Sequence, residues 1–383
     1  MDIRQFTPES PGRLIPVEGI HEATHAYLPD LLPPRWEWLV DLWPTLLRAH
    51  RELARLDGIG RHLPDPNLLL RPLESREAQR SSQLEGTFAT PRQLMLFELE
   101  PSVATSAADP DNAAREVANY AAALREGLRM LAADTPFSLW LVRQLHRHLL
   151  EGVRGSDSNP GSFRQRQVQI GRPPRFVPAP PFYLPERLDN FEQFARREER
   201  QYDPLVDAFI LHYQFEAIHP FEDGNGRVGR LLLSLMITRW YGLSNQWLYM
   251  SEYFDTNKDE YFERLFQVSA RNDWNGWIRF CLEGVVEQSI NTEQRCSRLL
   301  QLSASFKERI SALRGSLRLQ DIVDRLFIVP VVQTSSLAAR YEVVYHTARA
   351  DIEKLRSIGI LEELPNAPKK TYFAPEIIEI IYE

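Results

Sequence analysis

Residues 219–230 read HPFEDGNGRVGR, and no other stretch of the chain carries so specific a pattern. It lies between two predicted helices, at about 204–218 and 228–241, whose apolar residues recur at helical spacing. The stretch contains, in order, a histidine, an aspartate, a Gly-Asn-Gly loop and two arginines: His219, Asp223, Gly224, Asn225, Gly226, Arg227 and Arg230.

These residue types suit chemistry on phosphate groups. A glycine-rich loop that opens a helix offers backbone N–H groups and a positive dipole end to an anion. Arg227 and Arg230 add bidentate phosphate donors, and Asp223 supplies the single carboxylate that suffices for Mg²⁺ beside phosphate oxygens. His219 has a side chain whose ordinary pKa suits a general base near neutral pH. The pattern therefore predicts phosphoryl or nucleotidyl transfer. The phosphate-binding pattern GxxxxGK[ST] is absent from the sequence.

The stretch resembles the signature HPFx[DE]GNGRxxR of the Fic family and matches every specified position. The surrounding sequence is similar to the same family: HYQFEAIHPF before it, GSFRQRQVQIG at 161–171, EYFERL at 260–265 and SSQLEGT at 81–87. With the C-terminal region, the resemblance covers nearly the whole chain, and its architecture is similar to bacterial two-domain Fic proteins of the SoFic type.

The resemblance implies a reaction and a set of roles. His219 would take a proton from a Tyr, Ser or Thr hydroxyl of a target protein, which attacks the α-phosphate of ATP and displaces pyrophosphate. Asp223 would bind Mg²⁺, Arg230 would reach the γ-phosphate, and Phe221 would anchor the loop in the core. The other implied ATP-binding positions are Gly224, Asn225, Gly226, Arg227, Val228, Gly229 and, against the adenine, Tyr261. His146 and His212 lack such a context and are interpreted as packing residues.

Two further segments gain a role from the resemblance. Residues 81–86, SSQLEG, match the family's inhibitory pattern [ST]xxxE[GN] with Ser81, Glu85 and Gly86. A Glu85 carboxylate paired with Arg230 would occupy the partner of the γ-phosphate and misalign the α-phosphate, and misplacement of reacting atoms lowers a rate by orders of magnitude. A predicted short hairpin would form the flap on which a target segment pairs as an added strand: Val168, Gln169, Ile170 and Gly171.

The fold expected is mainly α. Helices are predicted at 45–56, 77–84, 112–131, 137–150 (with Thr135 as N-cap), 258–270 and 274–302. Proline-rich residues 1–35 are expected to be irregular, which leaves the flap as the only strand signal before residue 340. After residue 316, three helices and two short β runs indicate a winged helix. We expect an N-terminal helical region at 1–110 with the inhibitory helix near 75–86, a Fic catalytic domain at 111–302 and a winged-helix domain at 316–383.

Composition narrows the function classes. The 383 residues carry a net charge of −7, and Cys281 and Cys296 have no metal or redox spacing. With no signal-peptide pattern and no apolar run long enough to span a bilayer, we expect a cytoplasmic protein without membrane contact. Residues 316–383 hold eight Lys/Arg and ten Asp/Glu, which favours protein interaction or dimer packing over DNA binding.

Three functions stay open at this point. The first is adenylylation of a target protein with ATP and Mg²⁺, restrained by Glu85. The second is a Fic-type enzyme that uses another donor or removes AMP from a target. The third is a winged-helix regulator that senses nucleotide and binds DNA through Arg349 or Lys369.

Overall fold

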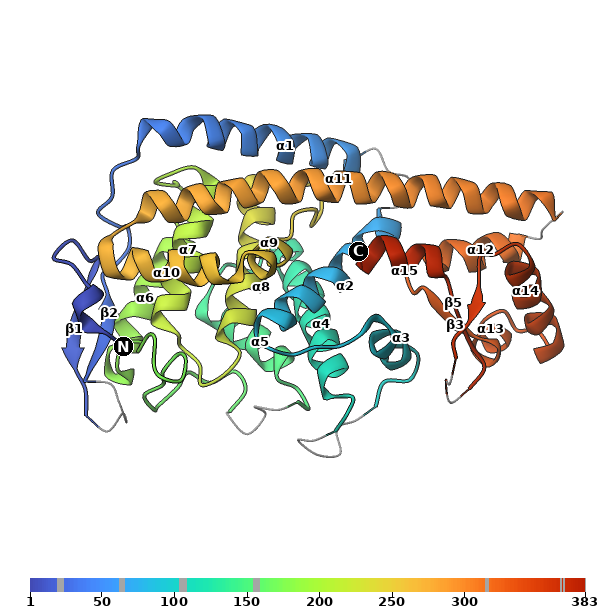
Figure 1. Ribbon diagram of the computed structural model, residues 1–383, viewed down its shortest axis with the longest axis horizontal. Helices are drawn as coiled ribbons and strands as arrows, with labels where there is room; N and C mark the ends of the chain where they lie inside the picture. The colour runs from blue at the N-terminus through green and yellow to red at the C-terminus, as the bar shows by residue number, and fades with distance from the viewer. Residues whose placement is uncertain are drawn as a thin grey trace.

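The computed structural model describes residues 1–18, 24–61, 66–102, 109–153, 159–313, 317–365, 367 and 369–382. The fold is mainly α-helical, with a small N-terminal β-hairpin and a small C-terminal sheet. In Figure 1 the hairpin lies at one end of an elongated molecule and the C-terminal sheet near the other, with most of the helices between them.

The centre of the molecule is a pair of buried helices, α7 (Pro204–Ile218) and α8 (Asn225–Tyr241). Nearly every residue of α7 is buried, as expected of a helix that is apolar on all sides. Asp203 caps α7 by accepting a hydrogen bond from the Leu205 N–H at 2.9 Å. Around the pair pack α4 (Asn112–Ala132), α5 (Leu139–Leu149) and α6 (Leu184–Ala195). This packing fixes the segment between α7 and α8, residues 219–224, which we call the motif loop.

Further helices enclose this centre. Figure 1 shows α1 (Trp43–Arg61) beside α11 (Trp274–Ala312) along one long edge. Helices α9 (Ser251–Thr256) and α10 (Lys258–Arg271) precede α11, and α2 (Asn67–Leu84) packs against α4 and α9. The other helical segments before the C-terminal region are α3 (Pro91–Leu99), η1 (Ile3–Gln5), η2 (Val40–Leu42) and η3 (Pro181–Tyr183). No helix among the described residues is long and apolar enough to cross a membrane.

Several predicted helix boundaries move. The helix predicted at 77–84 is the last part of the longer α2, although its predicted stop at Gly86, where φ is +80°, is confirmed. Thr135 is not the cap of α5; the Ser138 side chain accepts from the Leu141 N–H instead. Helix α8 starts at Asn225 and not at Val228, which places the Gly-Asn-Gly turn within the start of the helix.

The expectation of an irregular N-terminus is wrong. Strands β1 (Gly12–Pro16) and β2 (His25–Pro29) form an antiparallel hairpin with Gly12 opposite Pro29. Its prolines lie at strand ends, where a missing N–H costs no ladder bond, so proline content alone was a poor guide. The Tyr27 N–H donates to the Val177 carbonyl at 2.8 Å, which joins β2 to the segment after the flap.

The flap is also less regular than predicted. Where the sequence suggested a hairpin, one antiparallel bridge joins Ile170 to Phe176. Between them Gly171 adopts φ +87°, a conformation that glycine takes without strain. The segment therefore forms a turn closed by a single bridge and not a two-stranded ribbon.

The C-terminal region contains the elements predicted from sequence and two more. The predicted elements are α12 (Leu317–Leu326), α13 (Thr334–Arg340), α14 (Tyr345–Ser357), β4 (Glu362–Glu363) and β5 (Thr371–Phe373). Strand β3 (Val331–Gln333) and helix α15 (Pro375–Tyr382) are additional, and the sheet order is β3-β5-β4, antiparallel throughout. The name winged helix stays a prediction, as do the proposed domain limits; residues 316 and 383 lie outside the described residues.

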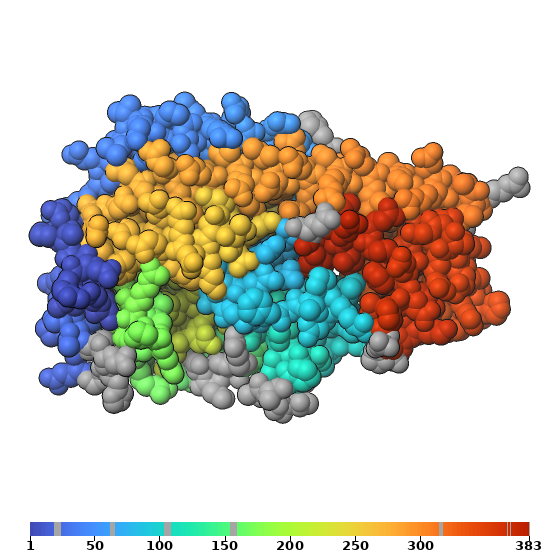
Figure 2. Space-filling model, in the orientation of Figure 1, coloured from blue at the N-terminus to red at the C-terminus, as the bar shows by residue number. Residues whose placement is uncertain are grey.

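The C-terminal region is closely packed against the rest of the molecule. Helix α11 continues past the predicted end at Leu302 and contacts both α12 and α15, while α15 also packs on α2. Figure 2 shows the C-terminal residues, in red, against α11, in orange, and against the cyan surface to which α2 and α3 belong. One continuous helix thus spans the proposed domain boundary.

Candidate active site

The motif loop is held in one conformation by its own side chains. His219 ends α7 in the left-handed region, with φ 51° and ψ 62°, and Gly224 starts α8 with φ 78°. The Asn225 amide bonds twice to Phe221: its Oδ1 accepts from the N–H at 2.8 Å, and its Nδ2 donates to the carbonyl at 2.9 Å. Asn225 therefore closes the loop.

Phe221 is fully buried, as its predicted anchoring role requires, and its ring stacks on His146 at 3.7 Å. Nδ1 of His146 accepts from the Gly161 N–H at 2.8 Å, so Nε2 carries the proton and donates to the Asp223 carbonyl at 3.0 Å. Burial lowers the pKa of His146 to about 4, which keeps this ring neutral. His146 is more than a packing residue, because it also holds the motif loop by a hydrogen bond.

Arg164 fixes the loop from the other side, a role that the sequence did not reveal. Its buried guanidinium donates to the carbonyl oxygens of His219 (2.8 Å) and Ala179, and its own N–H donates to the Pro220 carbonyl at 2.9 Å. Burial lowers the pKa of Arg164 to about 10. The residue ties the end of α7 to the segment that follows the flap.

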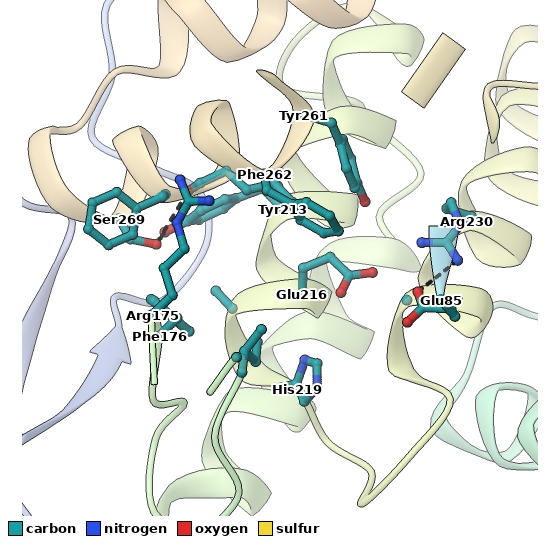
Figure 3. Close-up of a pocket in the computed structure, with 16 residues that line it drawn as sticks. Glu85, Arg175, Phe176, Tyr213, Glu216, His219, Arg230, Tyr261, Phe262 and Ser269 are labelled. Atoms are coloured by element: carbon teal, nitrogen blue, oxygen red, sulfur yellow. Dashed lines mark hydrogen bonds and ion pairs between the residues drawn. The ribbon is translucent and has the colours of Figure 1, made fainter. Parts of the chain in front are cut away.

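A cavity of about 340 Å³ opens beside the motif loop, and we call it the central cavity. It is lined from α2, the flap, α7, α8 and α10 (Figure 3). Among the predicted site residues, it brings together His219, Gly226, Arg230, Tyr261, Glu85, Ile170 and Gly171. One end carries Arg230 and Glu85, and the other is largely aromatic, with Tyr213 and Phe262 beside Arg175.

His219 lines this cavity in its neutral form. Among the described residues its buried Nδ1 has no hydrogen-bonding partner. Burial lowers the pKa of His219 to about 4, and the positive charge of Arg164 lowers it further, against the opposing effect of Glu85. The imidazole is therefore free to accept a proton at neutral pH.

Arg230 is bound by the segment predicted to be inhibitory. Its Nε donates to the Ser81 hydroxyl at 2.9 Å, and its Nη2 donates to the Ser81 carbonyl and to Oε1 of Glu85, each at 2.8 Å. Burial raises the pKa of the Glu85 carboxyl, but the charge and hydrogen bond of Arg230, together with the charges of Arg227 and His219, outweigh it, so the pKa lies below its ordinary value. A Cβ at Gly226 would overlap the Glu85 carboxylate, so glycine at this position lets the pair form.

The other predicted ATP-binding positions are not part of the cavity wall. Arg227 is buried and donates to Glu116 of α4 at 2.8 Å, and Thr87 donates to the same carboxylate oxygen at 2.7 Å. The side chain of Val228 lies in the hydrophobic core. Asp223 has a half-exposed carboxylate whose Oδ1 accepts from the Gly224 N–H at 2.7 Å. Gly224, as N-cap, has no side chain that could cap α8.

Tyr261 lines the cavity but is almost fully buried and is held from behind. Nδ1 of His212 donates to the Gly229 carbonyl at 3.2 Å, so Nε2 accepts from the Tyr261 hydroxyl at 2.9 Å. Burial lowers the pKa of His212 to about 3, which keeps it neutral in this role. The ring of Tyr261 is therefore fixed at the cavity wall.

Two of the four residues of the predicted target-docking flap also line the cavity. Ile170 and Gly171 line the cavity, whereas Val168 and Gln169 are not part of its wall. The Gln167 amide donates to the carbonyls of Val168 (3.1 Å) and Pro178 (2.6 Å), which holds the start of the turn against the segment that follows it.

Comparison with known proteins identifies the class. Residues 43–129 match the Fic/DOC family N-terminal model, and residues 136–237 match the Fic/DOC family model. A solved Fic family protein from Desulfovibrio desulfuricans G20 has a TM-score of 0.54 at 19% identity and covers 88% of this chain and 97% of its own. Residues 43–129 and 136–237 therefore match the Fic/DOC family, and the chain has the Fic fold.

Within the Fic region the chain is homologous to protein adenylyltransferases. It is 41% identical over 101 residues to a probable protein adenylyltransferase of Aquifex aeolicus and 36% identical over 99 residues to a protein adenylyltransferase of Caenorhabditis elegans. Each match covers 26% of this chain but only 28% and 18% of those relatives. A solved fragment of the C. elegans Fic-1 protein has a TM-score of 0.54 at 21% identity, covering 67% of this chain and 74% of its own.

Proposed function

We propose that the chain is a protein adenylyltransferase that transfers AMP from ATP to a Tyr, Ser or Thr hydroxyl of a target protein. The observation that carries the proposal is the neutral His219 in a cavity that also presents Gly226 and Arg230 from the start of α8. A base and an anion site within one cavity are what in-line attack on a phosphate requires.

The start of α8 is the proposed phosphate site. Gly224 provides no capping side chain, so the N–H groups of the first turn stay available to an outside acceptor. Arg227, bound to Glu116, adds positive charge behind this turn, and Arg230 would bind the terminal phosphate once Glu85 is displaced. His219 would then accept the proton of the target hydroxyl as that oxygen attacks the α-phosphate.

Asp223 is the proposed ligand of Mg²⁺. Its carboxylate is half-exposed beside the start of α8, and Mg²⁺ is commonly held by one or two carboxylates with phosphate oxygens and water as its other ligands. When bound, the ion would neutralise charge on the phosphates. The residues present fit this role.

Glu85 is the proposed brake. Its ion pair with Arg230 occupies the guanidinium that the terminal phosphate would need. The Arg230 guanidinium donates two further hydrogen bonds, both to Ser81. ATP that binds without this contact would carry its α-phosphate out of line with the target hydroxyl. We infer that release of Glu85 activates the enzyme.

Label transfer tests the proposal. Wild type, Glu85→Gly and Glu85→Gly/His219→Ala are incubated separately with ATP labelled at the α- or the γ-phosphate, with Glu342→Gly as a control for the same substitution outside the cavity. We expect α-label on the protein, increased by Glu85→Gly only and lost with His219→Ala. Incorporation of γ-label would instead identify a phosphotransferase, and the absence of both labels would contradict self-modification with ATP.

Another donor, or removal of AMP from a target, remains an alternative that the same incubation with other nucleotides would separate.

For the C-terminal region we propose a role in protein contacts, including a homodimer, over DNA binding. Lys369 pairs with Glu100, and Arg356 pairs with Glu353 at 3.0 Å, so each of these two cations already has a carboxylate partner. A nucleotide-sensing regulator would need DNA binding that Arg349→Ala abolishes.

A reducing compartment such as the cytoplasm is in keeping with the free, buried Cys281 and Cys296.

A further inference from the structure

The side chain of Glu216 lies in the central cavity, and the proposed reaction gives it no role. It lies on α7 three residues before His219, and both residues line the cavity. Its Oε1 is buried and has no hydrogen-bonding partner among the described residues. A buried carboxylate without a partner is costly, and such costs are typical of functional sites.

The surroundings of Glu216 distinguish it from Glu85. Arg230 makes its hydrogen bonds to Ser81 and Glu85, so Glu216 is not the ion-pair partner of that guanidinium. A Cβ at Gly229 would overlap Oε1 of Glu216, just as one at Gly226 would overlap Glu85. The two carboxylates therefore lie along one face of α8, about one helical turn apart.

Glu216 lies between the two ends of the cavity. Figure 3 shows it between Arg230 with Glu85 on one side and Tyr213 with Phe262 on the other, above His219. A nucleotide has the order phosphate, ribose, base. With phosphates at the end that carries Arg230 and the base against the aromatic rings, the ribose would lie beside Glu216. Carboxylate oxygens accept hydrogen bonds from sugar hydroxyls, as the acidic residue of dinucleotide-binding folds does with the ribose 2′-OH.

We propose that Glu216 accepts hydrogen bonds from the ribose hydroxyls of the donor and so selects ribonucleotides over 2′-deoxyribonucleotides. This inference rests on the proposed function, because it places the donor nucleotide in the central cavity. It makes Glu216 a specificity-determining contact, separate from the base His219 and the brake Glu85.

Binding measurements with ATP, 2′-deoxy-ATP and 3′-deoxy-ATP test the inference. Isothermal titration with Mg²⁺ uses the Glu85→Gly/His219→Ala chain, which cannot turn over, and the same chain with Glu216→Met or Glu216→Gln. The matched control is Asp207→Asn, which changes another buried carboxylate with an unpartnered oxygen on α7 that does not line the cavity.

The inference predicts that the parent chain binds ATP about 10-fold more tightly than one of the two deoxy analogues, the order of magnitude that one ordinary hydrogen bond contributes. Glu216→Met should reduce that ratio to about 1, Glu216→Gln should give an intermediate ratio, and Asp207→Asn should leave it unchanged. Glu216→Gln retains one acceptor oxygen and tests the inference even if Glu216→Met does not fold.

Two results would overturn the inference and leave the proposed function intact. One is equal binding of all three nucleotides by the parent chain, and the other is selectivity that persists in Glu216→Met and Glu216→Gln. Absence of any nucleotide binding by the parent chain would overturn the proposed function itself, and the inference with it.

Discussion

His219 shows how burial prepares a single residue for its task. Burial and the Arg164 charge lower its pKa to about 4, whereas Glu85 opposes them. The acid limb of kcat/KM reports the pKa of the base in the free enzyme. In Glu85→Gly the opposing charge is absent, so we expect that limb well below pH 6.5, the ordinary value for histidine. A pH profile of α-label transfer measures it, and an acid limb at pH 6.5 or above would contradict this assignment.

Glu216 should cost stability in exchange for its proposed role. Burial raises its pKa from 4.5 to about 8, so the folded chain keeps the proton that the unfolded chain loses above pH 4.5. Stability is therefore lost as the pH rises from about 4.5 to about 8, and Glu216→Gln removes this loss.

We expect Glu216→Gln to be more stable than wild type, and by a larger margin at pH 8 than at pH 5. One pKa unit corresponds to about 1.4 kcal/mol, so the difference between the two pH values should be on the order of 1 kcal/mol or more. Urea unfolding at both pH values measures it. An equal effect at the two pH values would show that the carboxyl titrates normally.

Local sequence gave a good account of some residues and not of others. The Glu85–Arg230 pair and the placement of His219 followed from the resemblance of two short motifs to the Fic family. No motif in the sequence marks Glu216 or Arg164. Glu216 is distinguished by a buried oxygen without a partner, and Arg164 by the carbonyl groups that it binds in the folded chain. No spacing rule reports these contacts.

Among the elements, α8 links the glycines of the motif to the cavity. Glycine inside a helix normally costs about 1 kcal/mol relative to alanine, yet a Cβ at Gly229 would overlap Glu216. We predict that Gly229→Ala destabilises the wild-type chain but is neutral or stabilising when combined with Glu216→Ala. Thermal or urea unfolding of the four chains gives the coupling. Additive effects would mean that Gly229 does not make room for Glu216.

The elements also show where pattern reasoning succeeds. Long helices with a regular apolar face, such as α4 and α10, were predicted within about one residue of their observed ends. The β1–β2 hairpin was missed because its strands are short and bounded by prolines, and its stability comes from tertiary contacts of Tyr27 with Phe176 and Phe6. Contacts between residues distant in sequence leave no local signal.

At the scale of the whole molecule, α2 connects the proposed brake to the C-terminal region. Arg76 of α2 is buried, bonds to Glu252, and donates to the Ile381 carbonyl of α15 at 2.7 Å. Arg309 of α11 holds the start of α15 through Glu376 at 2.7 Å. Helix α2, whose C-cap is Glu85, is thus bound at Arg76 to the last helix of the chain.

We predict that Arg76→Met increases hydrogen exchange in both α2 and α15, because it leaves Glu252 and the Ile381 carbonyl without this donor. Arg71→Met is the control, since Arg71 lies on the same helix, is half-exposed and contacts only Glu74 among the pairs described. Unchanged exchange in α15 of Arg76→Met would show that the two helices are held together by other contacts.

The most direct measurement is the intact mass of purified Glu85→Gly after incubation with ATP and Mg²⁺, beside Glu85→Gly/His219→Ala. The proposed function predicts a gain equal to one or more AMP groups in the first chain and no gain in the second. A gain equal to phosphate, or AMP attachment that survives the loss of His219, would contradict the assignment of His219 as the base of an adenylyl transfer.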